Sequence, residues 1–167
     1  REKQRLLQLM RSLAGFGGIE ILTYCLMSNH FHMLVHVPAR SEVSDAELLR
    51  RLAYILEPRE VREVAAQLKG YRGEGNAAAA EALKAHYTYR MFDISEFFKA
   101  LKQRFSQYYN TREDRRGPLW EQRFKSLLVE GSAHALLTMA AYIELNPVRA
   151  GLLRDPKDYR YSGYGAA

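Results

Sequence analysis

The chain has 167 residues, 47% of them hydrophobic, which is enough for one domain with a real core and short for two. Its net charge of +6 favours a polyanionic partner such as nucleic acid, although many basic domains bind none. Cys25 is the single cysteine, which excludes an internal disulfide and a multi-cysteine zinc site and fits a reducing, cytoplasmic setting. No run of about 18 apolar residues is present, so we expect no membrane span.

The N-terminal elements predicted from the sequence are a helix and two strands. Apolar residues at helical spacing predict a helix over residues 1–14, stopped by the glycines that follow. The apolar and β-branched run 19–27 predicts a buried strand, and residues 30–37 predict a second one. The turn signal Ser28-Asn29 lies between them, so we expect an antiparallel hairpin.

The middle of the chain predicts a helical insertion, at about residues 41–90, within a single domain that spans 1–167. Three short helices are expected there, at 45–56, 59–69 and 77–86. Ser44 or Asp45 is a plausible N-cap for the first of them.

The C-terminal part predicts an amphipathic helix at 95–110, a strand at 124–129 and a helix at 132–145. The last helix should end at Asn146-Pro147, because a residue before proline avoids the helical region. Strands mixed with helices in this order predict an α+β fold, with helices packed on an antiparallel sheet.

His30 and His32 are candidate metal ligands. They lie two residues apart on the second predicted strand, so both side chains point to the same face. Two adjacent imidazoles suit a divalent metal, although a lone His-x-His is common by chance. His36 has the same parity but lies farther along the strand and is a poorer ligand.

Tyr142 and Asn146 are a second candidate pair. They lie four residues apart near the end of a predicted helix and therefore on one helix face. A tyrosine phenol near a metal-polarised phosphate can act as a nucleophile, and an amide oxygen one turn away can complete the metal shell. The alternative is that Tyr142 packs the helix and Asn146 caps it.

Several basic side chains are candidates for contact with DNA phosphates, although a solvated face is the commoner fate of any single one. They are Lys102, Arg104, Arg115, Arg116, Arg123 and Lys125.

Two blocks together resemble a known family. Residues 24–34 (YCLMSNHFHML) are similar to the HUH motif of transposases of the insertion-sequence 200 type, above all the REP-associated tyrosine transposases. Residues 142–151 (YIELNPVRAG) resemble the tyrosine block of that family, with 120–125 and 158–162 resembling its flanking segments.

The resemblance implies a ferredoxin-like or RRM-like fold for the HUH nuclease core. It also implies that the protein cuts single-stranded DNA at sites that are often flanked by hairpins. It implies that Tyr142 attacks a phosphate to form a 5′-phosphotyrosine. His30 and His32 would bind Mg²⁺ or Mn²⁺, with Asn146 in the place of a third ligand. It leaves open whether one chain builds the site or two chains share it in a homodimer.

The sequence departs from the family pattern at three points. Ser28 stands where proline is common, and the 41–90 segment is longer than in compact members. The family usually begins with a strand carrying a His-Val-Thr-like segment, whereas this sequence begins at the first helix. We therefore expect either that the sequence is a fragment or that the sheet is completed differently.

Two other functions stay open at this point. One is a non-catalytic relative that binds single-stranded or hairpin DNA. The other is a metal-dependent hydrolase without a covalent step, which would require acidic ligands near the histidines. Glu20 and Glu144 are the obvious candidates for that role.

Overall fold

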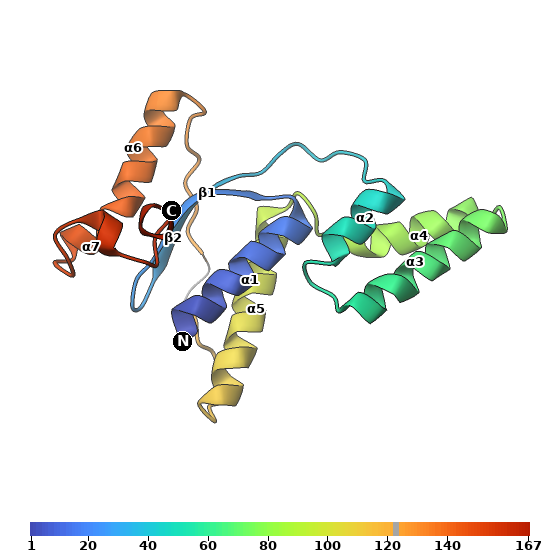
Figure 1. The fold of residues 1–167 in the computed structure, drawn as a ribbon, viewed down its shortest axis with the longest axis horizontal. Coiled ribbons are helices and arrows are strands. Elements are labelled where there is room, and N and C mark those ends of the chain that lie inside the picture. Colours follow the sequence, from blue (N-terminus) through green and yellow to red (C-terminus); the bar gives the residue numbers. More distant parts are fainter. Residues whose placement is uncertain (122–123) are drawn as a thin grey trace. The chain divides into compact units, whose positions relative to one another are not determined.

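The computed structural model describes residues 1–121 and 124–167 (Figure 1). The elements, in chain order, are α1 (Glu2–Gly17), β1 (Glu20–Leu26), β2 (Phe31–His36), α2 (Asp45–Leu52), α3 (Pro58–Gly73), α4 (Ala77–Thr88), α5 (Ile94–Arg112), α6 (Ala133–Glu144) and α7 (Asn146–Arg149), followed by the 3-10 turns η1 (Pro156–Asp158) and η2 (Tyr164–Ala166). Helices combined with an antiparallel sheet make this an α+β protein, which confirms the predicted class. Within the described residues, no helix has the length and apolar character needed to span a bilayer.

The chain divides into two compact units, which we describe separately. The sheet unit comprises Arg1–Gln8, Glu20–His36 and Phe105–Ala167, and the helical unit comprises Leu9–Ile19 and Val37–Arg104. The predicted organisation, one domain with an insertion at 41–90, stays a prediction. The hairpin, α6 and the C-terminal tail all belong to the sheet unit, so β2 and α6 can be compared directly.

The sheet unit is built on the β1–β2 hairpin, which is antiparallel as predicted. In its register Cys25 lies opposite His32. Helix α6 packs against both strands, and Figure 1 shows it beside them. Cys25, Leu34 and Ile143 belong to one buried cluster at this contact. Burial of these apolar side chains between helix and sheet supplies the main favourable free energy for their association.

The C-terminal tail covers the other edge of β1. The Leu26 N–H donates to the Tyr161 carbonyl oxygen at 2.9 Å, and the Gly163 N–H donates to the Tyr24 carbonyl oxygen at 2.9 Å. An isolated antiparallel bridge joins Cys25 to the tail between these two bonds. The tail therefore satisfies backbone groups that an edge strand would otherwise leave unpaired.

The strand predicted at 124–129 is wrong. These residues have no regular secondary structure, and Leu128 is 98% exposed. Val129 packs against the buried cluster of the sheet unit, but no described strand pairs with the segment. An apolar run has strand composition, yet a strand needs a neighbour to satisfy its N–H and C=O groups.

The predicted end of the last long helix also needs correction. Helix α6 ends at Glu144, but helical backbone resumes at once in α7, with Pro147 in its first turn. A proline in the first turn costs no helical hydrogen bond, because the backbone N–H groups at these positions have no acceptor within the helix. The Asn146-Pro147 pair therefore joins two helical segments.

The helical unit holds α2, α3 and α4 around a second buried core. Leu48, Leu52, Val64 and Leu68 are its large aliphatic members, and Phe16 joins them from α1. Figure 1 shows the three helices packed together. The predicted helices at 45–56, 59–69 and 77–86 are confirmed, with boundaries shifted by a few residues.

Polar contacts join the same three helices at their surface. The Ser44 side chain accepts from the Glu47 N–H at 3.1 Å, which confirms this residue as the N-cap of α2. Arg72 on α3 donates to both Asp45 carboxylate oxygens at 3.0 Å and to Glu81 on α4 at 2.6 Å. The Arg72 guanidinium lowers the pKa of the Asp45 carboxyl below its ordinary value.

A pair of identical substitutions tests the core of the sheet unit. Leu26 is 1% exposed and Leu128 is 98% exposed. We expect Leu26→Ala to lower the free energy of unfolding by about 2–5 kcal/mol, because it leaves a cavity in the core. Leu128→Ala should change it by less than about 0.5 kcal/mol. Urea unfolding followed by circular dichroism measures both, and similar losses in the two variants would contradict this core.

Candidate active site

His30 and His32 lie side by side at the start of β2. His32 is on the strand, and His30 lies in the turn just before it. Their ring centroids are 5.1 Å apart and the rings are nearly perpendicular, at 84°. The alternation of side chains along extended backbone places both rings on one side. This is an arrangement in which two imidazole nitrogens can approach a common cation.

Neighbouring groups orient the His30 ring and favour the neutral form of His32. Nδ1 of His30 lies 2.8 Å from Oδ1 of Asn29. With the proton on Nδ1, His30 donates to this oxygen and presents the Nε2 lone pair. Burial lowers the pKa of His32 below its ordinary value, and neighbouring His30 lowers it further. A neutral imidazole is the form that binds a metal.

Tyr142 lies on α6 next to the histidine pair. Its ring centroid is 6.2 Å from that of His32, at an interplanar angle of 79°. The neighbouring Ile143 is buried in the contact with the sheet, and this contact fixes the rotation of α6. Tyr142 is 46% exposed, so its phenol is accessible to a large substrate. The structure thus brings His30, His32 and Tyr142 together within one unit.

Asn146 begins α7, one turn after Tyr142. Its side-chain nitrogen donates to the Tyr142 carbonyl oxygen at 2.9 Å and to the Ile143 carbonyl oxygen at 3.3 Å. The side chain therefore caps the end of α6, as the alternative interpretation expected. These bonds use the nitrogen, so a metal would have to bind through the side-chain oxygen, and the role of third ligand stays a prediction.

The two carboxylates considered for a hydrolase are engaged elsewhere. Glu20 lies 3.0 Å from Nδ1 of His36. Glu144 accepts from the Thr23 hydroxyl, and also from the Tyr164 N–H at 3.0 Å. Among residues 1–121 and 124–167, no group of three or more His, Cys, Asp or Glu side chains is placed to hold a metal. This arrangement does not favour a carboxylate-rich hydrolytic centre.

The predicted DNA-binding residues are divided between the two units. Arg115, Arg116 and Lys125 are exposed in the sheet unit, and the Arg115 guanidinium carbon lies 5.8 Å from the Tyr109 ring centroid. Lys102 and Arg104 are half-buried on the part of α5 that belongs to the helical unit. Arg123 lies outside the described residues. A shared DNA-binding surface for these six residues stays a prediction.

One residue of the site was missed by the sequence reasoning. The Arg149 guanidinium carbon lies 5.1 Å from the Tyr142 ring centroid. The two residues are seven positions apart, which is the spacing of two helical turns. That spacing was the available signal, but the predicted stop at Asn146-Pro147 concealed it.

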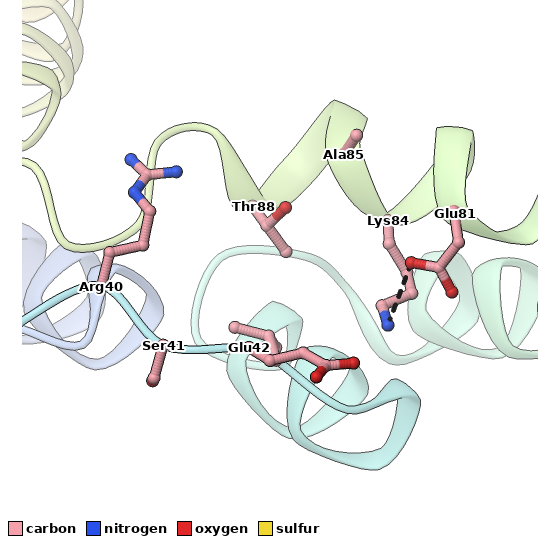
Figure 2. Close-up of a pocket in the computed structure, with 8 residues that line it drawn as sticks. Arg40, Ser41, Glu42, Glu81, Lys84, Ala85 and Thr88 are labelled. Atoms are coloured by element: carbon pink, nitrogen blue, oxygen red, sulfur yellow. Dashed lines mark ion pairs between the residues drawn. The ribbon is translucent and has the colours of Figure 1, made fainter.

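A hollow lies on the helical unit, and it contains none of the predicted site residues. Its volume is about 210 Å³. Figure 2 shows Lys84 and Glu81 on one side of it, joined by an ion pair of 3.4 Å. Lys84 also pairs with Asp45 at 3.5 Å. Its buried charge is therefore compensated within the protein, and the hollow shows no arrangement specific to catalysis.

Comparison with known proteins gives one finding that bears on this geometry. Residues 1–52 match a protein family described as "Transposase IS200 like". This segment is therefore similar to transposases of that family. The match includes the hairpin and both histidines, supports the resemblance to transposases of the insertion-sequence 200 type, and ends before the tyrosine block. No match was found among curated proteins or among solved structures.

The histidine pair predicts a measurable metal affinity. We expect His32→Ala to weaken Mn²⁺ binding at least tenfold, because it removes one of two imidazole ligands. His36→Ala is the matched control, since His36 lies on the same strand but faces Glu20. Titration of Mn²⁺ followed by the EPR signal of the free ion measures both affinities. An equal loss in the two variants would refute the assignment of the site to the pair.

Proposed function

We propose that this protein is a transposase-like enzyme that cuts and transfers single-stranded DNA through a covalent bond to Tyr142. The observation that carries the proposal is the approach of Tyr142 to His32, with 6.2 Å between ring centroids. This contact joins two blocks that are far apart in the sequence and that resemble the same family. The family match over residues 1–52 supports the same class of function.

The donor set fits a divalent metal such as Mg²⁺ or Mn²⁺. His30 and His32 supply two adjacent imidazoles, and the side-chain oxygen of Asn146 is the proposed third ligand. When bound, the metal would neutralise charge on the scissile phosphate and polarise its phosphorus–oxygen bonds. The protein itself contributes the orientation of these ligands and the position of the nucleophile.

The first step is an in-line attack by the phenol oxygen of Tyr142 on the phosphorus. The bond from this oxygen to phosphorus forms as the bond from phosphorus to the 3′ oxygen breaks. The phenol proton passes to solvent, and the departing 3′ oxygen takes a proton to become a 3′-hydroxyl. Phosphoryl transfer depends on alignment and charge neutralisation more than on a strong base, and the packing of α6 on the sheet supplies the alignment.

The covalent step also allows the strand to be rejoined. The 5′-phosphotyrosine retains the phosphodiester energy, so a 3′-hydroxyl can attack it and release Tyr142. A hydrolase would lose this energy to water. Because one chain holds both histidines and Tyr142 in one unit, the geometry supports a site built by one chain rather than one shared in a homodimer.

The substrate proposed is single-stranded DNA flanked by an imperfect hairpin. The net charge of +6 is consistent with a phosphate-rich partner. The 46% exposure of Tyr142 suits a polymer that must lie across the surface of the protein. Duplex DNA would present its phosphates in a stiffer backbone that is harder to bend into the site.

Removal of the phenol oxygen tests the covalent mechanism. A hairpin-containing single strand, labelled at its 5′ or its 3′ end, is incubated with protein and Mn²⁺ and run on a denaturing gel. We expect the wild-type protein to form an adduct with the 3′-labelled fragment and Tyr142→Phe to form none. Tyr89→Phe, which alters a similarly exposed ring in the helical unit, should retain wild-type activity.

The other outcomes distinguish the alternatives. Cleavage by Tyr142→Phe would contradict the covalent mechanism and support a hydrolase. DNA that is bound but not cut, with Mg²⁺ or Mn²⁺, would support a non-catalytic binding protein.

A further inference from the structure

Arg149 is held beside the nucleophile by the short helix α7. The backbone N–H of Arg149 donates to the Leu145 carbonyl oxygen at 2.9 Å, and this bond continues the helical path from α6. Its guanidinium carbon lies 5.1 Å from the centroid of the Tyr142 ring. A guanidinium over an aromatic face at this distance makes a favourable cation–π contact. The contact therefore places the positive charge of Arg149 beside Tyr142, the residue proposed to attack the phosphate.

The described part of the structure gives Arg149 no carboxylate partner. Among the residues that the structure describes, Arg149 forms no ion pair, and its side chain lies at the surface. Arg72 differs, because it binds Asp45 and Glu81, and Arg112 pairs with Glu2 and Glu113. A planar guanidinium that lies over a ring keeps its N–H groups available at its edge. Those groups match the geometry of phosphate oxygens.

We propose that Arg149 binds the scissile phosphate and holds it beside the phenol oxygen of Tyr142 for attack. This role rests on the proposed function. As the phenol oxygen approaches phosphorus, negative charge increases on the other phosphate oxygens, where the guanidinium N–H groups donate. A positioned donor stabilises that charge more in the transition state than in the ground state, so it accelerates cleavage more than it tightens binding.

Single-turnover cleavage of a hairpin-containing single strand tests this role. Arg149→Gln should slow adduct formation about 100-fold or more, while the dissociation constant for the DNA rises less than about tenfold. Arg149→Lys keeps the charge but loses the planar fork, so it should recover part of the rate. Added guanidinium ion should also raise the rate of Arg149→Gln.

The matched control is Arg160→Gln. The Arg160 guanidinium carbon lies 4.7 Å from the centroid of Tyr161, in the same unit, so the same kind of contact is removed from another tyrosine. We expect wild-type rates from this variant. Wild-type rates from Arg149→Gln, or equal losses from both variants, would overturn the proposal.

A binding measurement separates this inference from the proposed function. This measurement uses protein that carries Tyr142→Phe. The logarithm of its DNA affinity falls as the logarithm of the salt concentration rises, and a further Arg149→Gln change should make that slope shallower by about 0.7, because one phosphate contact is lost. An unchanged slope would overturn phosphate binding by Arg149, whatever the cleavage assay shows. Failure of the wild-type protein to form an adduct would instead refute the proposed function and, with it, the acceleration of cleavage.

Discussion

The packing of α6 on the β1–β2 hairpin is the constraint on which the candidate site depends. Ile143 is buried against Cys25 and Leu34, and this contact fixes the rotation of the helix. Tyr142, one position earlier, then lies at the helix surface beside His32. An apolar contact thus determines which polar groups meet, and a change in the core would shift Tyr142 relative to the two histidines.

Helix α6 is capped at both ends, and its two sides serve different purposes. Ser132 caps its N-terminus through a bond from the Ala135 N–H, and Asn146 caps its C-terminus. Glu144, on the opposite side of the helix from Tyr142, accepts from Thr23 on β1 and from the Tyr164 N–H. The same helix therefore anchors the tail on one side and presents Tyr142 on the other.

The sequence predicted the elements whose signals are local. The hairpin turn and the amphipathic helices are defined by neighbouring residues. The strand at 124–129 was wrong because strand formation depends on a pairing partner that local composition does not reveal. The histidine pair and Tyr142 were predicted through motifs. Arg149 was missed because its contact requires helical backbone through Pro147, which the rule for residues before proline did not predict.

The most direct test of the account is to identify the residue that carries the DNA. Protein incubated with Mn²⁺ and a hairpin-containing single strand is digested with a nuclease and then with trypsin, and the peptides are analysed by mass spectrometry. We predict a nucleotide phosphate on the peptide spanning 126–149, in which Tyr142 is the single tyrosine. A nucleotide attached to a different tyrosine, or to none, would contradict the account.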